Sequence, residues 1–367
     1  MPGITLLFLG QCYLSTNSFA QNSKSEKLLM QQYNTSVKIF DQWGMLGVNY
    51  SDNKVYLGVD GQGVYELDLA NLPGAIQYRQ IVKNIWVTAM FVQKNGEVWI
   101  GTFDGTSYKG ISIWRDGQSI LFNERDGLIS NYVKSIVPKN ETEMLVGSLF
   151  GVQGISCPQD EAPSPVSIYT KSRFISVNDV LYCEDRILVA SDYGLFFADG
   201  TTVSPVTTKN EPLNFKINSI CGDEKGRIWL GTDKGLSILE NNELKELTGV
   251  PGYIEGNIEK IKGHPQTHEI WFLCDEQLAM FKEDTFRFPL KTILSPNSGH
   301  IEDYVFTSQG VVISQRGKGL KYIDLATTRV KDELTITDVK IQGADIEVKF
   351  PDSEYYIYNL DNKGWVE

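Results

Sequence analysis

Seven side chains suited to holding a small polar ligand recur along the chain beside short apolar segments. They are six aromatic residues and one arginine: Trp43, Trp86, Tyr132, Phe150, Tyr193, Tyr253 and Arg316. Aromatic rings stack on the apolar faces of neutral sugars, while nearby carboxylates and amides form hydrogen bonds with the sugar hydroxyls. Each ring could instead pack between structural elements, and the aspartates near these rings could simply form turns. Both interpretations stay open for each residue.

Residues for acid–base or metal chemistry are few. The three histidines are His264, His268 and His300. The first two lie in KGHPQTHE, which could bind a metal but is better interpreted as a solvated turn. His300, close to Glu302 and Asp303, remains one candidate acid or base. The sequence shows no Ser-His-Asp order, phosphate-binding loop or metal motif, so we expect no catalytic residues, no cofactor and no metal.

Composition and charge narrow the class of protein. The 367 residues are 41% hydrophobic and 22% charged, as in soluble globular proteins. A formal net charge of -12, without a run of Lys or Arg, argues against nucleic-acid binding. Of the five cysteines, four lie beyond the first twenty residues, where they are widely spaced and form no CxxC motif: Cys157, Cys183, Cys221 and Cys274. Buried free thiols are favoured over metal ligands, and a disulfide stays open.

The first twenty residues predict export. An apolar stretch at Ile4–Leu9 is too short to span a bilayer, and it is followed by Ser18-Phe19-Ala20, a small-x-small cleavage pattern. We therefore interpret residues 1–20 as a signal peptide and expect a periplasmic protein.

A hairpin-like motif recurs seven times, and it is clearest in RIWLGTDKGLSIL at 227–239. The residue after its apolar run, here called the marker residue, recurs every 41 to 46 positions: Gly58, Gly101, Gly147, Ala190, Gly231, Leu273 and Ser314. The fourth copy has alanine at this position, and the sixth and seventh copies have leucine and serine. A period near 42 with two clear strands, and room for two more, is typical of the four-stranded blade of a β-propeller. We predict an all-β fold, with a seven-bladed β-propeller over residues 21–330.

An apolar segment before the first blade predicts how the ring closes. Blade seven ends with its third strand near Leu320–Leu325, whereas Val37–Phe40 resembles an outer strand with no blade of its own. We predict that Val37–Phe40 completes blade seven, because this pairing removes both open edges. The loops between second and third strands share one face with those that lead to the next blade, and this face, here called the loop face, carries the seven candidate ligand residues.

The repeats resemble a known family. IWLGTDKGL, VWIGT and DGLISNYV resemble the regulator-propeller repeats of bacterial two-component sensors, common in Bacteroidetes, and YYIYNLDNKGW at 355–365 resembles the tyrosine motif (Y_Y_Y) of the immunoglobulin-like domain that follows such propellers. The resemblance implies a periplasmic sensor that binds a glycan fragment or other oligosaccharide and signals to a membrane histidine kinase. A homodimer formed through the C-terminal domain is a further expectation.

Two other functions remain as alternatives. One is a protein-interaction scaffold, because propellers also bind peptides across the loop face. The other is a streptogramin-lyase-like enzyme, since those lyases are propellers with similar repeats that use His and Glu.

The C-terminal residues 331–367 predict the start of an immunoglobulin-like domain. Apolar and polar residues alternate over Leu334–Ile341, Ile346–Phe350 and Tyr355–Leu360, as in three strands. An immunoglobulin-like sandwich needs about seven strands. We therefore expect an incomplete β-sandwich that is poorly ordered or rests loosely on the propeller.

Overall fold

The computed structural model describes two parts of the chain. The first is 37–325, apart from 41, 50–53, 71, 73–75, 159–160, 172–175, 200–201, 209–210, 248–249, 251–252, 254, 276, 283–284 and 288–299, and the second consists of four strands within 338–366. The chain divides into two compact units, of which one is Ser36–Leu325 and the other contains the C-terminal strands. The predicted signal peptide lies outside the described residues and stays a prediction.

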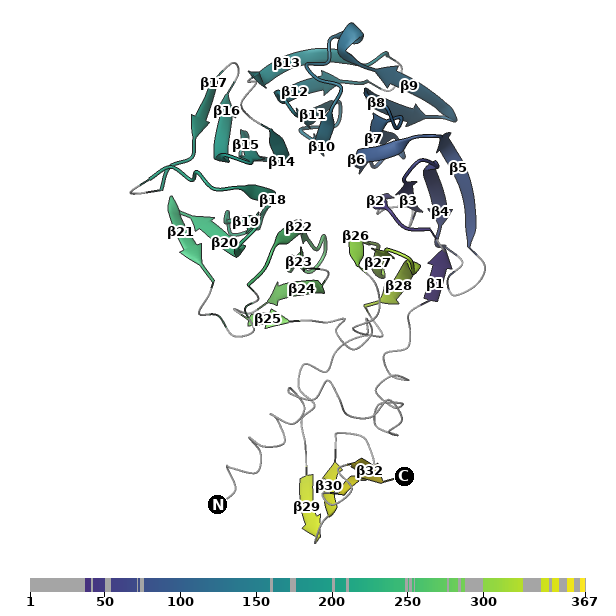
Figure 1. Ribbon diagram of the computed structural model, residues 1–367, viewed down its shortest axis with the longest axis vertical. Coiled ribbons are helices and arrows are strands. Elements are labelled where there is room, and N and C mark those ends of the chain that lie inside the picture. Colours follow the sequence, from purple (N-terminus) through teal and green to yellow (C-terminus); the bar gives the residue numbers. More distant parts are fainter. Residues whose placement is uncertain are drawn as a thin grey trace. The chain divides into compact units, whose positions relative to one another are not determined.

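Seven four-stranded antiparallel sheets of the described residues form a ring around a central opening (Figure 1). The predicted all-β, seven-bladed propeller is confirmed. The inner strands are β2 (Met45–Asn49), β6 (Trp86–Val92), β10 (Val133–Pro138), β14 (Val177–Cys183), β18 (Ile217–Gly222), β22 (Ile258–Gly263) and β26 (Ile301–Phe306). The second strands, which carry the marker residues, are β3 (Lys54–Val59), β7 (Val98–Phe103), β11 (Glu143–Ser148), β15 (Arg186–Ser191), β19 (Ile228–Thr232), β23 (Ile270–Cys274) and β27 (Gly310–Gln315).

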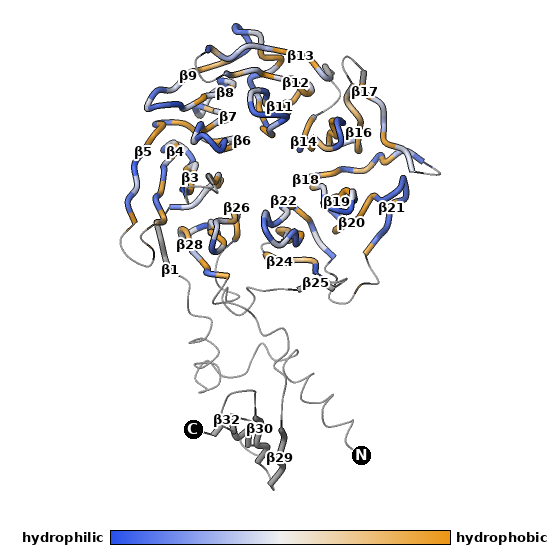
Figure 2. Tube along the Cα trace, turned by 180° about the vertical axis from the view of Figure 1, so that it is seen from behind, coloured by the Kyte–Doolittle hydropathy of each residue, from blue (hydrophilic) through white to orange (hydrophobic). Residues whose placement is uncertain are grey.

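The outer half of each blade follows the same order. The third strands are β4 (Gly63–Asp68), β8 (Tyr108–Arg115), β12 (Gly151–Ser156), β16 (Gly194–Asp199), β20 (Gly235–Glu240), β24 (Gln277–Lys282) and β28 (Gly319–Asp324). The outer strands of blades one to six are β5 (Gln77–Lys83), β9 (Gln118–Phe122), β13 (Ser164–Lys171), β17 (Thr202–Pro205), β21 (Glu243–Glu246) and β25 (Thr285–Arg287), and a short 3-10 helix, η1 (Glu124–Asp126), follows β9. Hydrophobic and hydrophilic positions alternate along these strands (Figure 2), so each blade has apolar faces to bury against its neighbours.

The outer strand of blade seven comes from the start of the ring. Strand β1 (Val37–Phe40) pairs antiparallel with β28, with Val37 opposite Tyr322 and Phe40 opposite Leu320. The predicted closure is therefore confirmed, and the last blade has four strands like the others. This pairing joins segments about as far apart in sequence as the ring allows, and it leaves the third strand of blade seven without an open edge.

The small marker residue is explained by the close approach of the next blade. A Cβ atom at Gly58 would lie 2.5 Å from Val87 Cγ2, and one at Gly231 would lie 2.7 Å from Ile258 Cγ2. Val87 and Ile258 belong to the inner strands of the following blades. A glycine marker therefore lets a β-branched side chain of one blade pack directly on the backbone of the blade before it.

The tryptophans of the repeat are buried structural residues. Trp99, Trp229 and Trp271 have 0 to 2% of their surface exposed. Their indole N–H groups donate hydrogen bonds to acidic side chains two or six positions earlier, at 2.5 Å to Glu97, 2.9 Å to Asp223 and 3.4 Å to Glu269. A buried indole N–H needs such an acceptor.

Two carboxylates, one half-buried and one fully buried, occupy the same place in different blades, opposite the marker residue. Asp179 pairs with Ala190 and Asp303 pairs with Ser314. Asp179 accepts hydrogen bonds from the hydroxyls of Ser135 (3.1 Å) and Ser219 (2.9 Å), in the two flanking blades, and burial raises its pKa. It has no lysine within ion-pair distance among the described residues.

Asp303 has two cationic partners. Lys260 Nζ and Lys262 Nζ lie 3.0 and 2.8 Å from its carboxylate oxygens. Burial alone would raise the pKa of Asp303, but the positive charges of Lys260 and Lys262 outweigh this effect and hold it at about 2. The carboxylate therefore stays ionised in the interior.

Cysteine chemistry in the ring is simple. Cys157, Cys183, Cys221 and Cys274 are free thiols, and Cys157 and Cys274 are buried. Burial raises the pKa of Cys221 to about 11 and that of Cys274 to about 12, which keeps both thiols protonated.

The C-terminal strands form one antiparallel sheet of their own. Three predicted strands are present as β29 (Asp338–Gln342), β30 (Asp345–Lys349) and β31 (Tyr355–Asn359). A fourth, β32 (Gly364–Val366), was not expected, and it places Trp365 opposite Tyr358. The tyrosine-motif residues thus belong to paired strands, and their assignment to an immunoglobulin-like domain stays a prediction.

Removal of the closing strand should destabilise the ring. A deletion of residues 21–41 leaves β28 as an open edge and removes the ladder hydrogen bonds between β1 and β28. We expect a loss of several kcal/mol in the free energy of unfolding, on the order of one per lost hydrogen bond, measured by urea denaturation. A truncated protein that unfolds at the same urea concentration as the full chain would contradict the closure.

Neutralising the Asp303 and Asp179 carboxylates should have unequal effects. Asp303→Asn leaves Lys260 and Lys262 without their counter-charge, and we expect it to cost about 2 to 4 kcal/mol at pH 7. Asp179→Asn leaves no lysine without a counter-charge, so its loss of unfolding free energy should be smaller. Because the pKa of Asp303 is lowered on folding, its contribution is present above the ordinary carboxyl pKa of about 4 and is lost as the pH falls toward 2. Urea denaturation across this pH range should show the Asp303→Asn deficit shrinking, and equal deficits for the two variants at pH 7 would contradict the assignment.

Candidate functional site

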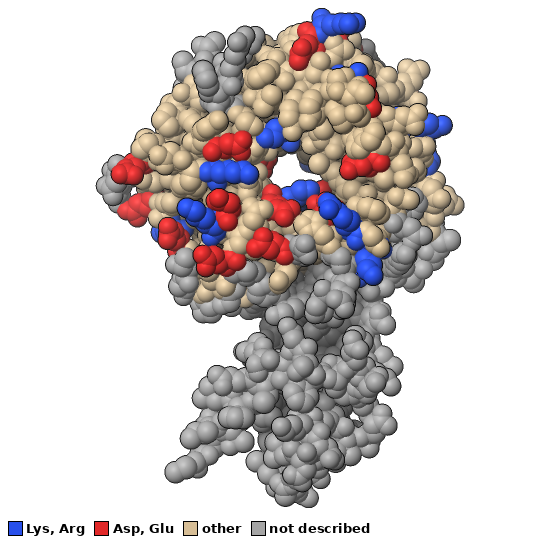
Figure 3. Space-filling model, viewed as in Figure 1, with Lys and Arg blue, Asp and Glu red and all other residues tan. Residues whose placement is uncertain are grey.

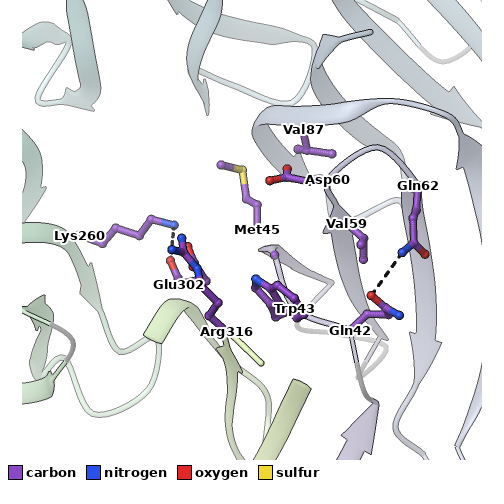
Figure 4. Close-up of a pocket in the computed structure, with 11 residues that line it drawn as sticks. Gln42, Trp43, Met45, Val59, Asp60, Gln62, Val87, Lys260, Glu302 and Arg316 are labelled. Carbon is purple, nitrogen blue, oxygen red and sulfur yellow. Dashed lines mark hydrogen bonds and ion pairs between the residues drawn. The ribbon is translucent and has the colours of Figure 1, made fainter. Parts of the chain in front are cut away.

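A pocket of about 390 Å³ opens on the loop face where blade one meets blade seven (Figure 4). Its volume is within the range of small-ligand sites. The lining residues come from blades one, two, six and seven and from the connection between β1 and β2: Gln42, Trp43, Gly44, Met45, Val59, Asp60, Gln62, Val87, Lys260, Glu302 and Arg316.

Short connections bring the polar side chains to this pocket. Trp43 lies between β1 and β2, Asp60 in the turn between β3 and β4, and Arg316 in the turn between β27 and β28. Lys260 and Glu302 reach it from the inner strands β22 and β26. In Figure 4, Trp43 lies between the Gln42–Gln62 pair and the group formed by Lys260, Glu302 and Arg316.

The backbone beside Trp43 is held by two side chains of blade seven. The N–H of Gly44 donates to Ser314 Oγ (2.8 Å), and the N–H of Leu46 donates to Asp303 Oδ2 (3.0 Å). A Cβ atom at Gly44 would lie 1.8 Å from the carbonyl oxygen of Gly58, so this position accepts only glycine. The Trp43 side chain itself is 36% exposed and free to stack on a ligand.

The pocket carries charges of both signs. Arg316 Nε donates to Glu302 Oε1 at 2.5 Å, and Lys260 Nζ donates to the Glu302 carbonyl oxygen at 3.1 Å. Within the described part of the chain, the Asp60 carboxylate accepts no hydrogen bond. Burial, and then the negative charge of Glu302, raise the pKa of Asp60, while Arg316 lowers it by a smaller amount. Acidic and basic side chains lie next to one another around the central opening (Figure 3).

Two of the predicted ligand residues form part of an aromatic row outside the pocket lining. Trp86 packs on Phe103 (ring centroids 5.9 Å apart), Phe103 on Tyr108 (4.9 Å), and Tyr108 stacks on Tyr132 (3.8 Å, 12° between the ring planes). A Cβ atom at Gly61 would lie 3.1 Å from Trp86 Cζ2, so the Trp86 indole borders the turn that holds Asp60. These rings already use much of their surface in packing.

The remaining predicted residues are spread around the loop face. Phe150 and Tyr193, in the turns β11–β12 and β15–β16, are 37% and 61% exposed. Tyr253 packs on Phe286, with ring centroids 5.7 Å apart, and its hydroxyl donates to the Lys234 carbonyl oxygen (3.3 Å). The structure thus brings Trp43 and Arg316 into one pocket but not the other five.

Sequence reasoning did not select most of the pocket. Asp60 could be recognised from the sequence as a carboxylate in a loop between a second and a third strand. Lys260 gave no signal, because it lies on an inner strand, where the repeat pattern indicates only packing. Glu302 was noted only as a neighbour of His300 and not as a ligand residue.

The histidine turn differs from expectation at one residue. His264 was expected on a solvated turn, but it is 6% exposed, and its ring packs near Phe306 (centroids 4.6 Å apart). Its Nδ1 accepts hydrogen bonds from the backbone N–H groups of Gln266 and Thr267, both at 3.2 Å. Burial lowers its pKa, so the neutral ring serves as the acceptor that closes the turn. His268, on the same turn, is exposed as expected.

Comparison with known sequences identifies one repeat. Residues 210–234 match the family model described as two component regulator propeller. This stretch contains β18 and β19, the inner two strands of blade five. Among proteins with curated descriptions, none matches the sequence.

Comparison with solved structures identifies the fold. The extracellular domain of a protein described as a one component system of B. thetaiotaomicron aligns with a TM-score of 0.59 and 12% identity, covering 91% of this chain and 47% of that one. The chain therefore spans about half the length of that domain. Virginiamycin B lyase from Staphylococcus aureus aligns with a TM-score of 0.57 and 11% identity, covering 79% of this chain and 98% of the lyase.

A further similar structure is YCF48 bound to D1 peptide, with a TM-score of 0.54, 11% identity, and coverage of 78% of this chain and 94% of that one. At such identities these likenesses show the fold alone. None of the described residues forms a helix with the length and hydropathy needed to cross a bilayer. The chain contains a seven-bladed β-propeller, and the inner strands of its fifth blade match the two component regulator propeller model.

Proposed function

We propose that this chain is the exported, ligand-sensing propeller of a two-component type of sensor and that it binds a neutral oligosaccharide at the pocket between blades one and seven. One observation carries the proposal: an exposed tryptophan, Trp43, shares a pocket with the Asp60 carboxylate, which accepts no hydrogen bond from the described residues, and with the Arg316 guanidinium.

The chemistry of these three side chains suits a sugar. The Trp43 indole offers an apolar face for the C–H face of a pyranose ring. The Asp60 carboxylate, with both oxygens available, can accept hydrogen bonds from two neighbouring hydroxyls. Arg316 uses its Nε–H on Glu302 and has further N–H groups for a ring or hydroxyl oxygen.

The form of the loop face favours a small ligand over a protein partner. A protein-interaction scaffold would present a continuous apolar patch. The exposed large hydrophobic side chains on this face are instead separate rings, Trp43, Phe150 and Tyr193, in different connections among the described residues.

The sensing role is supported by the repeat match in blade five and by the extracellular placement of the B. thetaiotaomicron domain with the same fold. In this proposal the chain carries no catalytic group, and it passes ligand occupancy to a histidine kinase at the membrane.

Loss of the Trp43 side chain should weaken ligand binding without unfolding the propeller. A panel of neutral oligosaccharides is screened against the purified chain by thermal shift, because a ligand that binds only the native state raises its melting temperature. Trp43→Ala should then reduce the affinity for the best ligand by about 1 to 3 kcal/mol, measured by titration calorimetry.

Tyr78→Ala provides the matched control. Tyr78 is also an exposed aromatic residue, at 58%, but it lies on the outer strand β5. This variant should bind like the wild type. A ligand whose affinity is unchanged by Trp43→Ala would exclude this pocket, and a chain that binds no oligosaccharide would exclude the proposed ligand class.

A further inference from the structure

We infer that Ser314 and Asp303 are positioning residues: they hold the Trp43–Leu46 segment on blade seven and thereby couple the pocket to closure of the ring. The inference rests on the proposed function only in treating Trp43 as the ligand-stacking side chain. Both residues lie outside the pocket lining, so they act through the segment they hold.

Ser314 occupies a marker position that is glycine in blades one, two, three and five. In those blades the absence of a Cβ atom lets the next inner strand pack closely, as at Gly58 and Gly231. Ser314, at 0% exposure, instead places a hydroxyl oxygen 2.8 Å from the N–H of Gly44, the residue after Trp43. A departure from the repeat therefore supplies a specific acceptor at the seam between the last and first blades.

Asp303 lies opposite Ser314 in the strand register and holds two walls of the pocket. One carboxylate oxygen accepts from the N–H of Leu46 at 3.0 Å and lies 3.0 Å from Lys260 Nζ, which lines the pocket. At 2% exposure it is fixed by the surrounding protein. Ser314 and Asp303, which lie on neighbouring strands of blade seven, thus accept hydrogen bonds from the N–H groups of Gly44 and Leu46.

The held segment follows directly on the closing strand. Residues 41–44 connect β1, which pairs with β28 of blade seven, to β2 of blade one. Trp43 can keep its place only while blade seven holds both β1 and this connection. Because binding and conformational equilibria are linked reciprocally, a ligand that needs Trp43 in place must also stabilise the closed ring.

The position of Trp43 can be followed without a ligand. The full chain is labelled with 5-fluorotryptophan, which gives fluorine signals from its seven tryptophans, and the Trp43 signal is assigned with Trp43→Phe. Ser314→Ala should shift or broaden the Trp43 signal. It should also speed amide exchange in β1 by about fivefold, the effect of losing one hydrogen bond of roughly 1 kcal/mol. Ser314→Thr, which keeps the hydroxyl, should restore both.

Matched variants separate positioning from general destabilisation. Ser191→Ala removes an equally buried hydroxyl, one that donates to the Gly194 carbonyl oxygen in blade four, and should leave the Trp43 signal and β1 exchange unchanged. Asp303→Asn should move the Trp43 signal, whereas Asp179→Asn, at the same position of another blade, should not.

A Trp43 signal that is unchanged in both Ser314→Ala and Asp303→Asn would overturn the inference. So would equal responses to Asp303→Asn and Asp179→Asn. Because these measurements use no sugar, they can fail while oligosaccharide binding stands, and they can succeed when no oligosaccharide binds.

Discussion

In four seams of this ring the inner strand of one blade packs against the glycine marker of the blade before it, and the marker residue sets how closely the two can approach. At Gly58 and Gly231 the added Cβ would lie 2.5 and 2.7 Å from a β-branched side chain, closer than real Cβ contacts. Glycine at these positions is therefore a requirement of the blade-to-blade contact. The glycine in the sequence repeat reflects this contact between neighbouring blades.

The pocket forms where this contact changes. At the seam between blades seven and one, Ser314 replaces the glycine and Asp303 faces it, so two side-chain hydrogen bonds to the backbone of blade one are added at the marker position. The acceptors Ser314 and Asp303 lie at this seam, close to the exposed Trp43 indole. Lys260 and Lys262 balance the negative charge of Asp303. Asp179, at the same position in blade four, accepts hydrogen bonds from two serine hydroxyls instead. The surroundings of each carboxylate, more than its place in the blade, thus decide its chemistry.

The repeat predicted the number of blades and the closing strand because each depends on a pattern of apolar residues that every seam must keep. It did not predict the pocket, which depends on side chains from four blades meeting at one seam. The ligand roles predicted for Trp86 and Tyr253 stay predictions. Their rings pack on Phe103 and Phe286, contacts that the sequence alone does not reveal. His264 was misplaced for a related reason: a polar residue in a Pro-containing turn gives no sign that its ring accepts two backbone hydrogen bonds in the interior. The short strand β32 lies only four residues after β31 ends, too close for the alternation pattern to show it.

The antiparallel pairing of β1 with β28 also sets how the ring responds to mechanical force. Val37 lies opposite Tyr322 and Phe40 opposite Leu320, so the chain enters β1 and leaves β28 at the same end of the pair. Tension applied between the two flanking segments loads the outermost hydrogen bond first and peels the strands apart bond by bond. Strands pulled from opposite ends would instead share the load in shear and resist together. The closing blade is therefore the point at which a pull on the two flanking segments opens the circle, while the other six blades, each continuous in sequence, bear none of that load directly.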